Sequence, residues 1–188
     1  MIDVSAFSGN FNGLQVPEVL QQLLEFENTV AAGRYYASGF ELVIAGENYG
    51  LKSYSEDKAF LNALCVFAQA DGTGSQYALW RRNNTEDIGE APVVILGSEG
   101  GFHVVAENLT GLLQILSYDT EPMVDWNSIY FYKDETDYEP GEATEQFHKW
   151  LADRFSISPV NDADRIVIAA QAVCGEEFKQ WMKKYYNG

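Results

Sequence analysis

Between residues 64 and 106, short apolar segments alternate with glycine-containing turns, and few folds accommodate that order. The expected strands lie near 64–69, 75–81, 92–97 and 101–106. The intervening turns are Asp71–Gly74, Asn83–Glu90 and Gly97–Gly101. A parallel pair of strands needs a crossover of about a dozen residues or more, so these short connections predict antiparallel neighbours.

The segment before these strands is predicted to contain one helix, two further strands and a short helical turn, which Ser55-Glu56-Asp57 caps and which leads to Phe60 and Leu61. The helix begins near Val16 and ends at Gly33, and its expected buried stripe consists of Val16, Leu20, Leu23 and Val30. The two strands are expected at Phe40–Ile44 and Tyr49–Tyr54. Residues 1–15 are rich in Gly, Asn and Ser, which indicates an irregular N-terminal arm.

Helices dominate the chain after residue 108, apart from a strand expected near 128–133. Asn108 has the position of a cap for a leucine-rich helix, and residues 134–142 form an acidic connector. Three apolar stripes at helical spacing follow, and Gly175 is expected to separate the last two. The stripes are Phe147, Trp150, Leu151 and Phe155; Ile166, Ala169, Ala170 and Val173; and Phe178, Trp181, Met182 and Tyr185.

This order of elements predicts a single α+β domain over residues 1–188. We expect a central twisted antiparallel sheet, with helices before it and a helical C-terminal segment packed on it. The helices are expected to cover one face of the sheet. No internal repeat and no low-complexity tract interrupts this organisation.

The chain carries 28 acidic and 12 basic residues, a formal net charge of −16. Such a surface repels nucleic-acid phosphates and anionic lipids, so we expect neither as a partner, and it attracts a basic protein. The N-terminus lacks the features of a signal peptide, and no apolar run is long enough for a membrane helix. Cys65 and Cys174 are interpreted as buried, reduced thiols, which favours a cytoplasmic protein.

The segment Asp71-Gly72-Thr73-Gly74 has the composition of a phosphate loop, a calcium loop or a hairpin bend. A phosphate loop leads into a helix, whereas the residues after Gly74 have the pattern of a strand. A calcium loop starting at Asp71 needs a glycine at its sixth position and a carboxylate at its twelfth, but these are Gln76 and Arg82. The sequence therefore predicts a hairpin bend that holds no ligand.

The two histidines, His103 and His148, have no second histidine or cysteine at metal-ligand spacing. His103 could act as a general base with Glu99 in a small hydrolase, although a single histidine in a strand is more often structural. Carboxylates are too numerous for a catalytic pair to stand out. We therefore expect a protein without enzymatic activity, metal ion or cofactor, and the hydrolase is the less favoured alternative.

Residues 119–145 carry nine acids and one base, Lys133. They form either a solvated acidic face or a docking surface for a cationic protein, and the sequence favours the two interpretations equally. Tyrosines beside the charges have the character of interface anchors. In the second interpretation Asp134, Glu135, Asp137 and Glu139 steer the partner, and Tyr130, Tyr132 and Tyr138 anchor it.

The stretches FLNALCVFAQADGTGSQYALWRR (60–82) and PVVILGSEGGFHVVAENLTGLLQIL (92–116) resemble the SUKH superfamily. That group includes a yeast regulator of cell-wall glucan synthesis and many bacterial immunity proteins. The similar features are the Phe-Ala before the turn, the Asp-Gly-x-Gly hairpin and the aliphatic strand after Pro92. The strand that ends in Val105-Ala106-Glu107-Asn108 and passes into a leucine-rich helix is also similar.

The resemblance implies a central antiparallel sheet flanked by helices, and a binding role. Bacterial members are thought to neutralise toxin domains, often nucleases or deaminases. We therefore expect an immunity protein that occludes the basic face of a toxin domain. The alternative is a regulatory or scaffold protein of the same fold that binds housekeeping partners. Sheet edges can pair between chains, which leaves a homodimer open.

Overall fold

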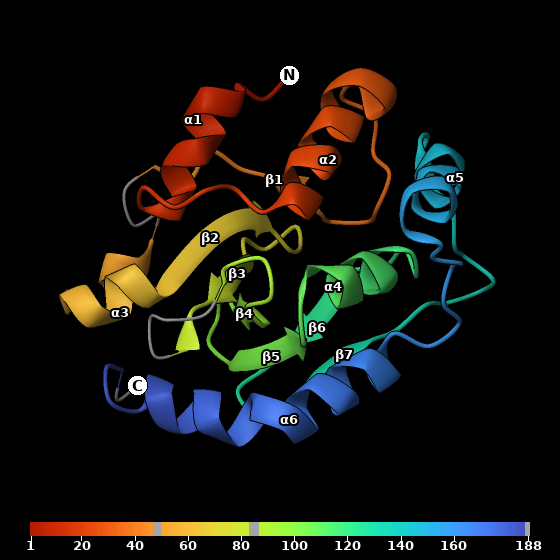
Figure 1. Ribbon diagram of the computed structural model, residues 1–188. Coiled ribbons are helices and arrows are strands. Elements are labelled where there is room, and N and C mark those ends of the chain that lie inside the picture. The colour runs from red at the N-terminus through yellow and green to blue at the C-terminus, as the bar shows by residue number, and fades with distance from the viewer. Residues whose placement is uncertain (47–49, 83–86, 187–188) are drawn as a thin grey trace.

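The computed structural model describes residues 1–46, 50–82 and 87–186 (Figure 1). The helices are α1 (Val4–Ser8), α2 (Glu18–Phe26), α3 (Lys58–Ala63), α4 (Leu109–Leu116), α5 (Thr144–Phe155) and α6 (Asp164–Met182). The strands are β1 (Glu41–Leu42), β2 (Leu64–Gln69), β3 (Gln76–Trp80), β4 (Val93–Leu96), β5 (Phe102–Ala106), β6 (Pro122–Val124) and β7 (Ile129–Phe131). Among the described residues, no helix is both long enough and apolar enough to cross a membrane.

A five-stranded antiparallel sheet with strand order β1-β2-β3-β4-β5 forms the centre of the fold. The bend at Asp71–Gly74 joins β2 to β3, and the bend at Gly97–Gly101 joins β4 to β5. Part of the predicted turn at Asn83–Glu90, residues 83–86, lies outside the described residues. The predicted α+β class and the antiparallel central sheet are confirmed.

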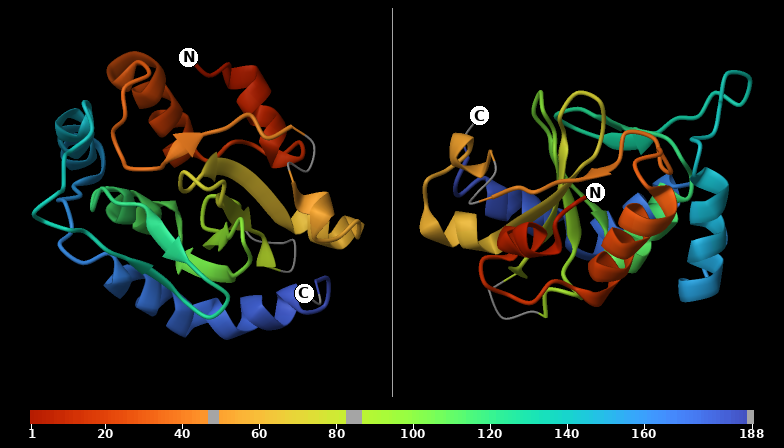
Figure 2. Two further views of the ribbon diagram at one scale, coloured as in Figure 1. Left: turned by 180° about the vertical axis from the view of Figure 1, so that it is seen from behind. Right: turned by 90° about the horizontal axis from the view of Figure 1, so that it is seen from above.

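Helices cover both faces of this sheet (Figures 1 and 2). Phe67, Leu79 and Ile95 point to a core shared with α1, α2, α4 and α5, whereas Trp80 and Val94 point to a core shared with α3 and α6. The expectation of a sheet covered on one face is therefore wrong. Val93–Leu96 contains no polar residue, which is the pattern of a strand buried on both sides.

Helix α6 runs unbroken from Asp164 to Met182, so the predicted break at Gly175 is wrong. A glycine inside a helix costs about 1 kcal/mol relative to alanine, and packing on the sheet exceeds that cost. The buried stripe of α6 consists of Val167, Ala170, Cys174, Phe178 and Met182. Ala169 and Val173, which the predicted stripe placed inside, are exposed.

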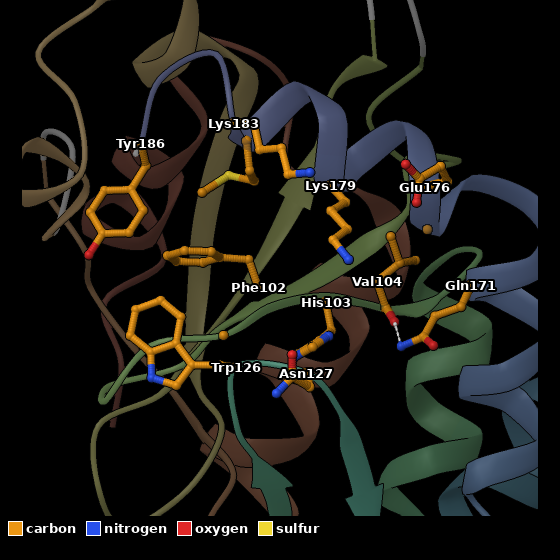
Figure 3. A pocket seen from close by; sticks show the side chains of 13 residues that line it. Phe102, His103, Val104, Trp126, Asn127, Gln171, Glu176, Lys179, Lys183 and Tyr186 are labelled. Carbon is orange, nitrogen blue, oxygen red and sulfur yellow. Dashed lines mark hydrogen bonds between the residues drawn. The ribbon is translucent and has the colours of Figure 1, made fainter. Parts of the chain in front are cut away.

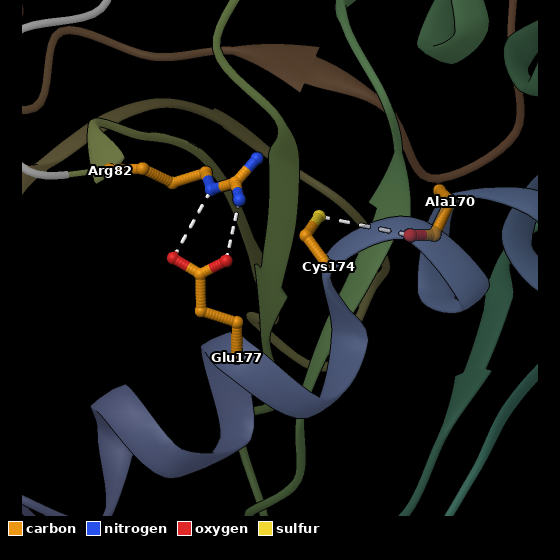
Figure 4. A network of polar contacts seen from close by, with 4 residues as sticks. All are labelled: Arg82, Ala170, Cys174 and Glu177. Carbon is orange, nitrogen blue, oxygen red and sulfur yellow. Dashed lines mark hydrogen bonds and ion pairs between the residues drawn. The ribbon is translucent and has the colours of Figure 1, made fainter.

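Aromatic packing and one ion pair hold α6 against the sheet. The ring centroids of Trp80 and Phe178 lie 4.9 Å apart, and the rings of Phe60 and Trp181 stack at 5.4 Å. At the end of β3, the guanidinium of Arg82 donates two hydrogen bonds to the carboxylate of Glu177 (Figure 4). The partly exposed ion pair contributes less than about 1 kcal/mol, so the buried rings are the main attachment.

The N-terminal segment is helical and packed, contrary to the irregular arm predicted for residues 1–15. The Asp3 carboxylate accepts a hydrogen bond of 2.7 Å from the amide of Ala6 and caps α1. Phe7 and Phe11 are fully buried, with ring centroids 5.6 Å apart. The side chain of Asn10 donates to the carbonyl of Val43, so this polar residue joins the segment to the sheet.

Two further elements between residues 16 and 54 differ from prediction. Helix α2 continues into a wider π turn over Glu27–Ala31, which buries Ala31 and leaves Val30 exposed, so the predicted stripe fails at Val30. A 3₁₀ turn at Leu51–Ser53 replaces the strand expected at Tyr49–Tyr54, of which Tyr49 lies outside the described residues. Ala31 and Leu51 are buried in the two cores, and local periodicity does not report these contacts.

The strand expected near 128–133 forms as β7, but it pairs with β6 in a separate two-stranded sheet. The amide of Phe131 donates to the carboxylate of Asp164 at 2.8 Å, which fixes the β6–β7 hairpin to the start of α6. Residues 134–142 then lead to α5 without a helix or strand (Figure 1).

Replacing Phe7 with alanine tests whether the N-terminal segment belongs to the core. We expect Phe7→Ala to lower the free energy of unfolding by about 3–5 kcal/mol, because it removes a fully buried ring. The control Val4→Ala, at an exposed position of the same helix, should change it by less than about 0.5 kcal/mol. Urea unfolding followed by circular dichroism measures both values. A loss of free energy of unfolding in Phe7→Ala that is as small as in Val4→Ala would contradict the packing of the N-terminal segment in the core.

Candidate functional site

The β6–β7 hairpin exposes four large apolar side chains. Met123 is 51% exposed, Trp126 58%, Tyr130 44% and Tyr132 67%. Met123 and Tyr130 are directly opposite each other across the two strands, and Tyr132 lies two residues further on, hence on the same side. We call these four residues the hairpin face.

The opposite side of the hairpin is buried. Pro122, Ile129 and Phe131 alternate with the exposed residues and face the domain. The two strands therefore follow the usual pattern of a half-buried sheet, except that the outward positions hold apolar side chains where polar ones are normal. Contiguous exposed apolar side chains of this kind mark interaction sites.

The loop that carries Trp126 is held in place by its own polar groups. The Asp125 carboxylate accepts hydrogen bonds from the amides of Asn127 (2.7 Å) and Ser128 (2.8 Å), and these bonds lower the pKa of Asp125. His103 Nε2 donates to the carbonyl oxygen of Asp125 at 2.7 Å. These contacts connect the loop that carries Trp126 to β5.

The predicted turn at Gly97–Gly101 provides the surface against which Trp126 lies. A Cβ atom on Gly100 would overlap the indole ring, and one on Gly101 would overlap the carbonyl of Asp125. Both glycines also have positive φ angles, which residues with side chains rarely adopt. This glycine cluster is thus a turn, as predicted, and it also lets the hairpin loop approach closely.

The four predicted steering residues lie beside the hairpin face. Asp134, Glu135, Asp137 and Glu139 are all exposed on the segment that follows β7. Asp134 accepts hydrogen bonds from the hydroxyl (2.7 Å) and the amide (3.0 Å) of Thr136, and both bonds lower its pKa. This carboxylate therefore stays ionised at neutral pH.

Tyr138 differs from the other two predicted anchors because its side chain is half-buried and bonded. Its hydroxyl donates to Asp119 at 2.6 Å, and Lys133 Nζ lies 4.0 Å from its ring centroid. Burial, followed by the bond to Asp119, raises the pKa of Tyr138. Buried Asp119 also accepts from Thr144 at 3.1 Å, so Tyr138 fastens the connector to α5.

Tyr130 and Tyr132, predicted as anchors, are exposed on the hairpin, whereas Met123 and Trp126 were not expected there. Residues 122–124 are too few to give a strand pattern, so β6 was not expected. The signal for the loop is Asp125 followed by Asn127 and Ser128, a combination typical of a turn closed by a side-chain carboxylate.

The Asp71–Gly74 segment is a hairpin bend whose amides are already bonded. Asp71 Oδ1 accepts from the amides of Thr73 (2.9 Å), Gly74 (3.0 Å) and Ser75 (3.0 Å). In a phosphate loop such amides face the bound anion, whereas here they bind a carboxylate of the same chain. The chain then continues as strand β3, as predicted.

The remaining candidate groups for chemistry have structural contacts. His148 Nε2 donates to the carbonyl oxygen of Ser117 at 3.0 Å. Burial raises the pKa of the Cys65 thiol to about 11, so it is protonated at neutral pH. Within residues 1–46, 50–82 and 87–186, no group of three or more His, Cys, Asp and Glu could hold a metal ion.

No protein-family model matches the chain, and no curated protein or solved structure is significantly similar to it. The resemblance to the SUKH superfamily therefore stays a prediction from the sequence.

The Asp71 carboxylate gives a pH-dependent test of the hairpin bend. Burial raises the pKa of Asp71, but the bonds from Ser75 and Thr73 outweigh it and the net shift is downward. A lowered folded-state pKa stabilises the protein above the unfolded value of about 3.9, and this contribution is lost as the pH falls through the lower folded value.

We therefore expect Asp71→Ala to lower the free energy of unfolding by about 2–3 kcal/mol at neutral pH, since three amides lose their acceptor. The deficit relative to the unsubstituted protein should shrink as the pH falls below about 4. Urea unfolding across this range measures it, with Asp153→Asn on the exposed side of α5 as control. A deficit independent of pH would contradict the role of the charge.

Proposed function

We propose that the protein is a non-catalytic binding domain and that its hairpin face docks a basic protein partner. Two properties that occur together support the proposal, namely exposed apolar side chains and exposed carboxylates. Four exposed apolar side chains stand on a hairpin fixed to the domain, and a segment with four exposed carboxylates follows directly.

The apolar residues are suited to supply affinity. Trp and Tyr are enriched among the residues that dominate binding energy, because they bury large areas and have few rotatable bonds. Trp126 and Tyr132 are the most exposed of the four, and hydrogen bonds of Asp125 hold the loop that carries Trp126. A partner that covers them gains their burial with little loss of conformational freedom.

The acidic residues are suited to raise the association rate and to select a basic partner. A chain with a net charge of −16 attracts a basic surface, and complementary charges raise the association rate and make it sensitive to salt. Proteins that act on nucleic acids carry basic grooves. Together with the resemblance to the SUKH superfamily, this supports a toxin domain of nuclease or deaminase type as the partner.

The proposal is tested by co-expressing the chain with the product of its neighbouring gene. We expect a complex that binds at least ten times more weakly at about 300 mM salt than at about 50 mM, measured by surface plasmon resonance. We also expect the complex to suppress the nuclease or deaminase activity of the partner. A housekeeping partner without such activity would favour the regulatory alternative, and the absence of any bound basic protein at low salt would contradict the proposal.

Variants separate the two contributions to binding. Trp126→Ala and Tyr132→Ala should each weaken the complex by about 1–4 kcal/mol, mainly through faster dissociation. Neutralising Asp134 and Glu135 with Asn and Gln should instead slow association and reduce its dependence on salt. The controls are Val4→Ala for an exposed apolar residue and Glu18→Gln for an exposed acid, both distant in the fold (Figure 1). If the control variants changed binding as much as the hairpin variants, this would contradict a docking site at the hairpin.

A further inference from the structure

A hollow of about 510 Å³ lies between the C-terminal half of α6, strand β5 and the loop of the β6–β7 hairpin (Figure 3). Its volume falls within the range of about 300–1,000 Å³ that is usual for small-molecule sites. Three different parts of the chain line it, so its shape is set by the tertiary fold.

One side of the hollow is aromatic. Phe102, Trp126 and Tyr186 line it, and Figure 3 shows their rings gathered at the same end. Phe102 and Tyr186 pack edge to face at 5.3 Å, and each packs in the same way on Tyr54, at 5.3 and 5.6 Å. These mutual contacts fix Phe102 and Tyr186, so this side of the hollow is formed without a ligand.

The other side is a row of residues at intervals of four, namely Gln171, Gly175 and Lys179 on α6 and Lys183 at its C-cap. Residues so spaced share one face of a helix. Across the part of the chain that the structure describes, no carboxylate lies within ion-pair distance of Lys179 or Lys183. Glu176 also lines the hollow, at the end away from the aromatic rings (Figure 3).

Gly175 keeps this wall open. Its φ angle is not positive, and a Cβ atom there would contact only the side chain of Gln171, at 3.1 Å. Neither the backbone conformation nor a neighbouring element therefore requires a glycine. Gly175 lines the hollow beside Gln171, so a side chain at this position would take up part of its space.

We propose that this hollow binds a small planar organic anion. The ring of the ligand lies against Phe102 and Trp126, and its carboxylate, sulfonate or phosphate accepts charge-assisted hydrogen bonds from Lys179 and Lys183. The sign of the charge distinguishes this site from the acidic connector. The ligand is therefore a different molecule from the basic protein partner proposed above.

The site is tested with a matched pair of probes, 2-naphthoate and the neutral 2-naphthalenemethanol. Titration of the ¹⁵N-labelled protein is followed by NMR at the indole N–H of Trp126 and the amides of Phe102 and Gly175. We expect 2-naphthoate to bind at least ten times more tightly than the alcohol, with its largest shifts at these groups. Equal affinities, or shifts centred elsewhere, would overturn the proposal.

Two kinds of variant test the two sides of the site. Lys179→Met and Lys183→Met should each reduce the preference for the anion at least threefold and leave the affinity for the alcohol unchanged. Lys149→Met, on the exposed side of α5, is the matched control and should have no effect. A preference for the anion that survives the double substitution would contradict the role of the lysines.

Gly175→Leu should weaken both probes, because its side chain takes up part of the hollow. Leucine favours helices more than glycine does, so circular dichroism and thermal unfolding should show a folded protein. If this variant bound the probes as tightly as the unsubstituted protein, the probes would bind outside the hollow, which would contradict the proposal. Trp126 belongs to both the hollow and the hairpin face, but these variants replace no residue of the hairpin face. Failure here therefore leaves the proposed docking of a protein partner unaffected.

Discussion

Burial of the central sheet on both faces determines where every other element lies. Val93–Leu96 offers apolar side chains in both directions, so helices must cover both sides. Helix α6 takes one face, and Lys179 and the C-cap residue Lys183 line the hollow beside β5. The start of this helix holds the β6–β7 hairpin through Asp164. Both proposed sites thus depend on how α6 packs on the sheet.

The sequence was sufficient where structure is determined locally. The strands from 64 to 106 and their glycine bends were predictable because apolar segments and turn residues alternate at short range. The helical N-terminus was not, because Phe7 and Phe11 gain their burial from the distant sheet. The continuity of α6 through Gly175 has the same origin, since the cost of the glycine is local and the compensating packing is not.

The candidate site was predictable in part, for the same reason. Tyr130 and Tyr132 stand beside acidic residues in the sequence, so their character as anchors could be inferred. Trp126 gains its significance from Gly100 and His103, which lie in another hairpin. The hydroxyl of Tyr138 donates a hydrogen bond to Asp119, nineteen residues away in the sequence, and no local pattern predicts this contact. The hollow beside α6 joins residues from three segments and could not be seen in any one of them.

We expect the partner to contact the β6–β7 hairpin and the acidic segment that follows it. Hydrogen–deuterium exchange of the chain, alone and saturated with its basic partner, tests this most directly. The account predicts slower exchange in the complex at residues 122–139, with the amides of α2 unchanged. Protection concentrated on α2 or on the edge strand β1, with the hairpin unaltered, would contradict it.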